Sequence, residues 1–248
     1  MEHKSADVIY GINPVVEALT AGKRRALRIY LSGSRGDRYE DVLRRLARER
    51  GVPLSAVPRQ ELARIASTND HQGVVGMFVP YPYSDIQSML AKAAQRGERP
   101  FIIALDEVQD PHNTGAIIRT ASCLGLHGVL LTKRRSVGIS PVVVKASSGA
   151  TEFIDIAVVA NLRSEVESLK AGGLTAVALD MQGKAGFGDV DARAGAVLVV
   201  GGEGSGIRRP VIDVCDVVVS IPLSGRPASL NASVSAGIAL FEIKSRMK

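Results

Sequence analysis

The chain has 248 residues, of which 46% are hydrophobic and 23% charged, a composition typical of a globular protein with one large domain or two smaller ones. No run approaches the ~20 consecutive apolar residues of a membrane-spanning helix, and the first residues lack the apolar core of a secretory signal. We therefore expect a cytoplasmic protein. The two cysteines, Cys123 and Cys215, exclude a disulfide framework or a cysteine-rich zinc site, and we expect two buried thiols.

The charge is distributed unevenly. A net charge of +6 suggests an anionic partner such as nucleic acid. Residues 1–80 carry 13 Lys and Arg against 9 Asp and Glu, whereas residues 101–248 carry 15 against 14, so the excess lies in the first third. Aromatic residues are scarce and Trp is absent, which argues against recognition by base stacking. Contacts to a nucleic-acid backbone fit this composition better.

The first eighty residues predict a small α/β domain. Asn13 is the predicted cap of a helix, with Pro14 at its first position. Strand patterns follow at 27–31, 54–57 and 73–79, and helical patterns at 37–50 and 60–66. Off the apolar stripe of the first of these helices lie five arginines, Arg38, Arg44, Arg45, Arg48 and Arg50. This basic face is either solvated or contacts phosphate.

A linker is predicted at 81–100, where prolines interrupt regular structure and Ser84 is the expected cap of a helix over 85–95. Beyond it, apolar strand patterns alternate with helical ones. The predicted strands are 101–105, 128–132, 153–159, 175–179, 196–200 and 214–221. Nearly continuous apolar strands of this kind favour a mostly parallel sheet that is covered on both faces.

Ligand sites in such sheets lie at the carboxyl ends of the strands, and the residues after the strand at 101–105 are polar. Asn113 is the expected cap of the helix that follows. Arg119 lies about 200° around this helix from Ile117, so it projects away from the apolar stripe. Considered alone, this segment is better explained by an exposed arginine beside an ordinary cap.

The strand at 196–200 runs into a glycine-rich turn that contains Glu203. Glycine allows the backbone to approach a ligand closely. The turn begins like a dinucleotide-binding fingerprint, but the spacing to the next glycine, Pro210 and the late position in the sheet argue against that interpretation. A structural turn explains the glycines, yet a single glutamate within it is less expected.

The third segment, 221–242, joins a strand end to a long apolar helix that either Ser229 or Asn231 caps. Val234, Ile238 and Phe241 share one stripe while other apolar residues lie elsewhere, so we expect burial on more than one face. A subunit interface is one way to supply the second cover. The four histidines lack metal-ligand spacing, and no GxSxG or Cys/His pairing marks a hydrolase. We expect no metal.

Together the three segments resemble the three motifs of the SpoU family of RNA ribose 2′-O-methyltransferases. The first motif, N-x-G-x-x-x-R, corresponds to Asn113, Gly115 and Arg119, and the second, G-x-E-x-x-G, to Gly201, Glu203 and Gly206. The third runs from Ile221 through Asn231. Residues 10–11 and 71–73 also resemble the family's small substrate-binding domain. The sequence departs from the third motif at Arg226, where a smaller or neutral residue is expected and a cation would alter RNA contact, and at Ala232 beyond it.

The resemblance implies an RNA substrate-binding domain over 1–80, similar to a ribosomal-protein α/β fold, a linker over 81–100 and a catalytic domain over 101–248. The catalytic domain would be a SPOUT-type α/β domain, with a mostly parallel sheet and a C-terminal deep trefoil knot. The implied cofactor is S-adenosyl-L-methionine, and the implied assembly is a homodimer. The residues that would hold the cofactor are Gly201, Gly202, Ile221, Leu223 and Leu230.

The overall pattern is most similar to family members that methylate a guanosine ribose in 23S, large-subunit ribosomal RNA. A tRNA ribose methyltransferase is the alternative, and a non-catalytic RNA-binding assembly protein is the less favoured one. The family assigns the activating role to Arg119, but a guanidinium is a poor resting base. We expect Arg119 to hold a phosphate and stabilise alkoxide charge. Asn113 and Glu203 would orient it or the ribose, and Ser229 and Asn231 would order the loop between cofactor and substrate.

Overall fold

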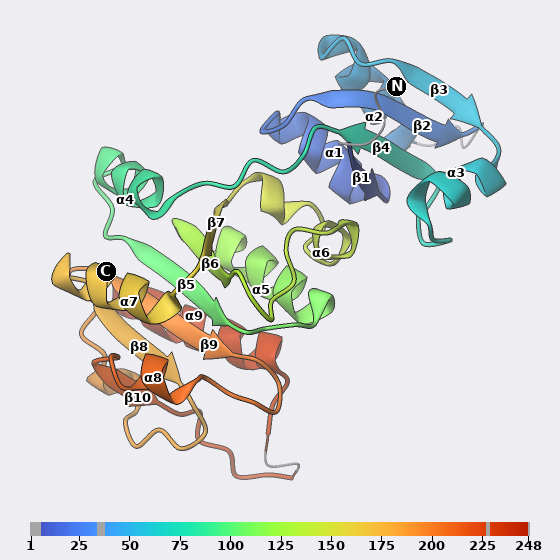
Figure 1. Ribbon diagram of the computed structural model, residues 1–248. Helices are drawn as coiled ribbons and strands as arrows, with labels where there is room; N and C mark the ends of the chain where they lie inside the picture. The colour runs from blue at the N-terminus through green and yellow to red at the C-terminus, as the bar shows by residue number, and fades with distance from the viewer. Residues whose placement is uncertain (1–5, 34–37, 227–228, 248) are drawn as a thin grey trace. The chain divides into compact units, whose positions relative to one another are not determined.

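The computed structural model describes residues 6–33, 38–226 and 229–247, and the chain divides into two compact units (Figure 1). The first unit contains the chain up to Pro82 together with Ile139–Phe153, and the second contains Tyr83–Gly138 and Ile154–Lys248. Within the described ranges, no helix combines the length and the apolar character needed to cross a membrane.

The first unit is built on a four-stranded sheet in the order β1-β4-β2-β3. Its strands are β1 (Asp7–Tyr10), β2 (Ala26–Ser32), β3 (Leu54–Val57) and β4 (Val74–Phe78), and its first three helices are α1 (Ile12–Ala21), α2 (Arg38–Glu49) and α3 (Arg59–Ala66). Neighbouring strand residues bury opposite faces, as the pleat requires. Val74 packs with α1 and α2, whereas Val75 packs with Leu62 of α3. The sheet is therefore covered on both faces.

Helix α1 begins earlier than predicted. The helix starts at Ile12, and its N-cap is Gly11 with φ 96°, a value that glycine adopts without strain. The prediction of Asn13 as the cap is therefore wrong. The chain enters the helix two residues sooner, because Gly11 adopts the backbone conformation of the turn. Asn13 lies inside the helix.

A segment that follows the second unit's β6 in sequence completes the first unit. This segment contains α6 (Pro141–Ala146) and a 3-10 turn at Ala150–Glu152. Val144 joins the core of the first unit. Arg24 donates to Glu152 through Nη2 at 2.6 Å, with side chains 1% and 0% exposed, and its Nη1 lies 2.9 Å from Asp7. A buried guanidinium thus fixes residues that are distant in sequence.

The second unit contains a six-stranded sheet in the order β10-β8-β9-β5-β6-β7, in which every neighbouring pair is parallel. The strands are β5 (Phe101–Asp106), β6 (Gly128–Thr132), β7 (Asp155–Val159), β8 (Thr175–Leu179), β9 (Ala196–Gly201) and β10 (Val217–Val219). The predicted α/β class with a mostly parallel sheet is confirmed. The strand predicted at 214–221 is shorter, because three residues, Val217–Val219, pair with β8.

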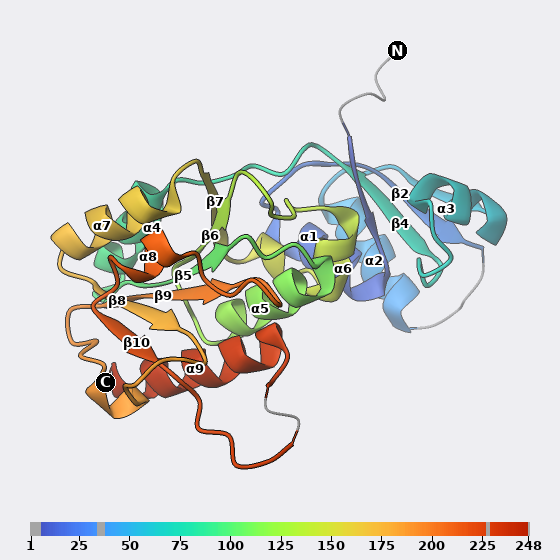
Figure 2. The ribbon, with the colours of Figure 1, turned by 60° about the horizontal axis from the view of Figure 1, so that its bottom comes forward.

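Helices cover both faces of this sheet. They are α4 (Ile86–Gln95), α5 (Pro111–Cys123), α7 (Leu162–Ala171), α8 (Arg209–Ile212) and α9 (Ala232–Arg246). Figure 2 shows α5 and α9 together on one face, with α4, α7 and α8 on the other. On that second face, Met89 and Val166 pack with the strand residues Ile102 and Val199. Because helices cover both faces, the carboxyl edge of the sheet, where loops leave the strands, is the place for a ligand site.

Two further expectations are wrong in detail. Asp85, rather than Ser84, caps α4, and its carboxylate accepts from the N–H of Ser88 at 2.7 Å. Ser84 instead donates its backbone N–H to the carbonyl of Ile156. Of the two thiols expected to be buried, Cys123 is exposed near the end of α5, whereas Cys215 is half-buried. Burial raises the pKa of the Cys215 thiol to about 12.

Candidate active site

The start of α5 positions the first motif. Asp110 caps this helix, accepting from the N–H of Asn113 at 2.8 Å, and Pro111 occupies the first turn. The prediction that Asn113 is the cap is wrong, because Asp110 lies three residues earlier and performs that role. Asn113 is therefore inside the helix, where its buried side chain faces other loops at the carboxyl edge.

Asn113, Glu203 and Asn231, one residue from each motif, form a closed hydrogen-bond network. The Nδ2 of Asn113 donates to Oε1 of Glu203 at 2.9 Å. The Nδ2 of Asn231 donates to the same oxygen at 2.7 Å and to Oδ1 of Asn113 at 2.9 Å. Hydrogen bonds to a charged group are stronger than neutral ones, so the two amides hold this carboxylate firmly. We call these three residues the polar trio.

Asn231 uses both ends of its amide. Its Oδ1 caps α9, accepting from the N–H groups of Ser233 at 2.9 Å and Val234 at 3.4 Å. Because the oxygen is engaged at the helix start, Nδ2 is directed toward Glu203. Of the two caps considered for this helix, Asn231 is confirmed. Ser229 and Leu230 are exposed in the preceding loop, where Pro227 and Ala228 of the third motif lie outside the described residues.

Glycines place Glu203 over the start of α5. A Cβ on Gly201 would clash with the backbone of Gly206, and one on Gly202 would lie 2.7 Å from the carbonyl oxygen of Glu107. The Gly202 N–H donates to the carbonyl of Asp106 at 3.2 Å, and the Gly206 N–H donates to that of Gly202 at 3.0 Å. The loop after β9 is thus folded tightly onto itself and onto the end of β5.

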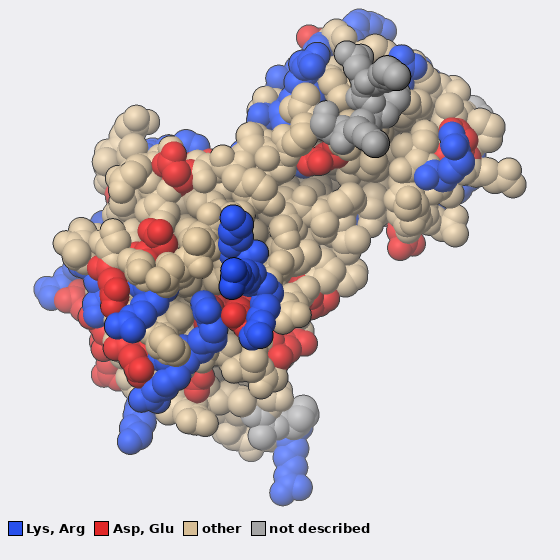
Figure 3. Space-filling model, in the orientation of Figure 1, with Lys and Arg blue, Asp and Glu red and all other residues tan. Residues whose placement is uncertain are grey.

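Arg208 forms a second polar cluster beside this loop. Its guanidinium lies 2.6 Å from Oδ1 of Asp106, whose side chain is fully buried, and its backbone N–H donates to Oδ2 at 2.9 Å. The hydrogen bond to Asp106 raises the pKa of Arg208. Figure 3 shows Lys and Arg side chains gathered on this face of the second unit. Sequence reasoning missed this pair, although an aspartate that ends a buried strand was a signal for it.

Arg119 lies on the same helix as Asn113. They are six positions apart, which corresponds to about 9 Å along the helix axis. The Arg119 side chain is exposed, as predicted, while the neighbouring Ile117 and Ile118 are fully buried. Arg119 therefore lies further along α5 than the residue that α5 contributes to the polar trio.

The five predicted cofactor residues follow two strands of the same sheet. Gly201 and Gly202 lie at the end of β9, whereas Ile221, Leu223 and Leu230 lie in the loop between β10 and α9. The two leucines are exposed although they are apolar. The glycines allow the chain to pack on itself, because a Cβ at either position would meet backbone. The exposed leucines are apolar side chains of the kind that contacts a flat ring, so they fit the adenosyl group of the predicted cofactor.

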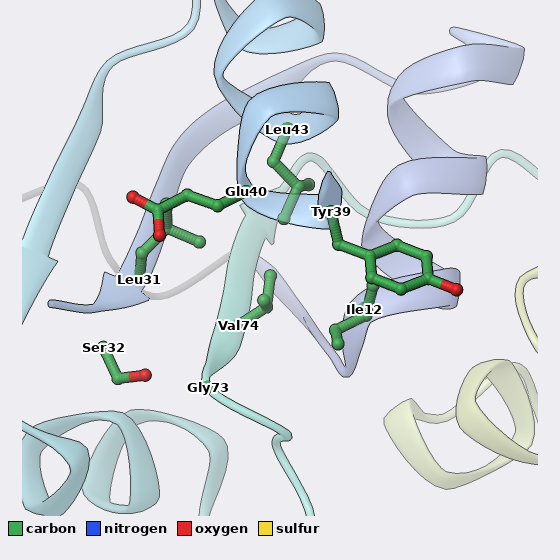
Figure 4. Close-up of a pocket in the computed structure, with 8 residues that line it drawn as sticks. All are labelled: Ile12, Leu31, Ser32, Tyr39, Glu40, Leu43, Gly73 and Val74. Carbon is green, nitrogen blue, oxygen red and sulfur yellow. The ribbon is translucent and has the colours of Figure 1, made fainter. Parts of the chain in front are cut away.

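Two hollows lie in the first unit. The larger, of about 250 Å³, lies beside α1 and β2 and is bordered by Arg24, Arg25 and Arg50 among others. The smaller has a volume of about 10 Å³ and is formed by β2, β4, the start of α1 and α2 (Figure 4). Such a space holds about one water molecule. Across the described part of the chain, no group of His, Cys, Asp and Glu is placed to hold a metal ion.

The fold and the polar trio define an α/β protein whose candidate site lies at the carboxyl edge of a parallel sheet. Residues 100–241 match the SpoU rRNA methylase family, and residues 8–84 match the RNA 2′-O ribose methyltransferase substrate-binding domain. The chain therefore belongs to the SpoU family, and its first unit carries the family's substrate-binding domain. The membership predicted from the motifs is confirmed.

Individual relatives agree with this membership. YacO of Bacillus subtilis, named for the TrmH family of tRNA/rRNA methyltransferases, is 36% identical over 96% of this chain and 94% of its own. An AdoMet-bound rRNA methyltransferase from Sinorhizobium meliloti has a TM-score of 0.78 and 26% identity, covering 100% of this chain and 90% of its own. The AdoMet complex of AviRb from Streptomyces viridochromogenes, at 24% identity, shares the fold with a TM-score of 0.81 over 98% of this chain and 90% of its own.

Proposed function

We propose that this protein uses S-adenosyl-L-methionine to methylate the 2′ oxygen of a guanosine ribose in 23S ribosomal RNA, in the cytoplasm. The observation that carries the proposal is the polar trio, which joins one side chain from each family motif around a single carboxylate oxygen. The intact trio also disfavours the alternative of a non-catalytic RNA-binding assembly protein. A tRNA ribose remains the alternative substrate, since the name of YacO includes both RNA classes.

The cofactor would be held by the loops after β9 and β10. Gly201 and Gly202 would supply close backbone contacts, and Ile221, Leu223 and Leu230 would supply apolar ones. When bound, S-adenosyl-L-methionine supplies an electrophilic methyl group on a sulfonium sulfur. The protein must then position the ribose hydroxyl, and good positioning alone supplies several kcal/mol of rate enhancement.

The polar groups have distinct roles in this proposal. Glu203, which Asn113 holds, would accept a hydrogen bond from the ribose and orient it. Arg119 would hold the adjacent phosphate and stabilise negative charge on the 2′ oxygen as the hydroxyl proton passes to water and the methyl group bonds to that oxygen. Asn231 orders the chain at the start of α9 through its cap, and Ser229 would order the loop between cofactor and substrate.

We also propose a homodimer in which a second subunit covers α9. In a single chain, Val234, Ile238 and Phe241 are 49%, 37% and 61% exposed, although they form one apolar stripe. Scattered apolar residues are normal on a surface, but an aligned stripe on one helix is typical of an interface. The opposite side of the helix contributes Leu240 and Ile243 to the protein interior.

A trefoil knot in the C-terminal part completes the proposal. Knots are rare, and this proposal rests on the chain's membership of the SpoU family.

The test is transfer of labelled methyl groups from S-adenosyl-L-methionine to unmethylated ribosomal RNA and tRNA, with the modified position mapped. We expect 2′-O-methylation of one guanosine in the large-subunit RNA. Methylation of tRNA alone would favour the alternative substrate. Folded protein that binds the cofactor but transfers no methyl group to either RNA would overturn the enzymatic proposal.

A further inference from the structure

A second basic surface lies on the second unit, where β5 and β6 end. Lys133, Arg134 and Arg135 directly follow β6 and are exposed. Arg208 follows the glycine loop after β9, and its side chain is 45% exposed. Figure 3 shows that Lys and Arg side chains gather on this face of the unit. We call these four residues the edge cluster.

One carboxylate joins the two parts of the edge cluster. Arg135 Nη1 lies 3.6 Å from Oε2 of Glu107, and Arg208 Nη1 lies 3.5 Å from Oε1 of the same residue. Glu107 has φ 57°, an uncommon value for a residue other than glycine, and its N–H donates to Oγ1 of Thr132 at 3.3 Å. The cluster is therefore built on backbone that the ends of β5 and β6 hold in place.

The edge cluster has more positive than negative charge. Its four cations face two carboxylates, and one of these, Asp106, is fully buried against Arg208. The side chain of Arg135 is 74% exposed. An ion pair at such an exposed position contributes little, so Arg135 can exchange Glu107 for another anion at small cost. Lys133 and Arg134 add two exposed cations beside it.

The edge cluster adjoins the loop that carries Glu203. The Gly202 N–H donates to the carbonyl of Asp106, and the Glu107 carbonyl lies against Gly202. We propose that the edge cluster binds the phosphodiester backbone of the substrate RNA beside the ribose that is methylated. This inference rests on the proposed function, and it assigns backbone contacts to the catalytic unit in addition to those expected of the basic first unit.

Two triple variants with equal charge loss test the proposal. The first is Lys133→Gln, Arg134→Gln and Arg135→Gln. The control is Arg96→Gln, Arg99→Gln and Arg193→Gln, because these exposed residues precede β5 and β9 and so lie at the opposite edge of the same sheet. For both variants, the RNA dissociation constant is measured between ~50 and ~200 mM salt, and cofactor binding is measured separately.

We expect the edge-cluster variant to bind RNA at least ~10-fold more weakly and the slope of log affinity against log salt to fall by about 2, as the loss of about three phosphate contacts predicts. The KM for RNA should rise more than kcat falls, and cofactor affinity should stay unchanged. Equal effects in both variants, or loss of cofactor binding with RNA binding intact, would overturn the edge-cluster proposal alone. Wild-type protein that binds no RNA would overturn the proposed function as well.

Discussion

At the scale of single residues, Asn231 shows how one amide serves both structure and the site. Its oxygen caps α9, and its nitrogen donates to Glu203. Aspartate is as good a helix cap as asparagine, so Asn231→Asp should preserve the start of the helix. It would, however, replace two donors by a second carboxylate next to Glu203. We expect the free energy of unfolding to change by less than ~1 kcal/mol and turnover to fall at least ~100-fold.

Denaturant unfolding and steady-state methyl transfer check this prediction together. Asn231→Ala is the comparison variant, because it removes the cap as well and should cost a further ~1 kcal/mol of stability. If Asn231→Asp retained wild-type turnover, the trio would have only a structural role.

Arg119 gives a second prediction at this scale. Its side chain is exposed, so Arg119→Ala should fold normally. We expect turnover to be abolished while the affinity for S-adenosyl-L-methionine stays nearly intact, because the arginine is proposed to act on the phosphate and the 2′ oxygen. Calorimetric cofactor binding and methyl transfer distinguish the two effects, with Arg163→Ala on α7 as the control. Substantial residual turnover would contradict the assigned role.

Residue-scale prediction from sequence failed mostly at helix starts. Asn113 and Ser84 are good capping residue types, but Asp110 and Asp85 lie nearby and perform the role. Several residues near each helix start could form a cap, and tertiary contacts select among them. At α9 one of the two candidates, Asn231, is the cap. The hydrogen bonds within the polar trio could not be predicted from local patterns, because its three residues lie far apart in sequence and meet only in the fold.

At the scale of elements, the Arg24–Glu152 pair makes the segment between β6 and β7 part of the first unit. Glu152→Gln removes the buried carboxylate while Asp7 still pairs with Arg24, so it should destabilise the protein by ~1.5–3 kcal/mol, the contribution of a charged hydrogen bond. The matched control is Glu167→Gln, whose partner Arg163 is exposed and which should change stability by less than ~1 kcal/mol. Chemical denaturation measures both, and equal small effects would refute the importance of the buried pair.

His127 gives a pH prediction at the start of β5. Its Nδ1 accepts from the N–H of Phe101 at 3.0 Å, and its Nε2 lies 2.9 Å from Glu98. Burial lowers the pKa of His127, although Glu98 partly opposes the shift and Lys244 and Arg96 add to it. The unfolded state therefore binds a proton more readily than the folded state. Stability from this group is present above about pH 6.5, the ordinary histidine pKa, and is lost as the pH falls.

The variant His127→Asn tests this linkage, because an amide oxygen can accept from Phe101 without titrating. Wild-type protein should lose more stability than the variant between pH 7.5 and 5.5 in denaturant unfolding, because only the wild type has a histidine at 127 that must be protonated against its burial. The comparison also removes the contribution of His71, whose pKa burial lowers in the same direction. Parallel pH profiles for the two proteins would show that His127 is not responsible.

At the scale of the whole molecule, apolar strand runs were sufficient to predict a parallel sheet but not its order. The order β10-β8-β9-β5-β6-β7 brings the end of β9 next to that of β5, although many residues separate them in the chain. Likewise, no local pattern in the sequence predicts that Ile139–Phe153 packs with the first unit. The ion pair that joins this segment to the unit, between Arg24 and Glu152, spans 128 positions. Long-range pairing of this kind is decided by packing rather than by local pattern.

The apolar stripe on α9 gives the last prediction, the homodimer. Phe241 is 61% exposed in one chain, and burying it against a second copy would remove apolar surface from water. Phe241→Glu places a charge in that interface and should convert a dimer into a monomer in sedimentation or light scattering. Met181→Glu is the control, because Met181 is 77% exposed but lies after β8, outside the stripe. A wild-type monomer, or a Phe241→Glu dimer of unchanged affinity, would require that the stripe has another function than self-association.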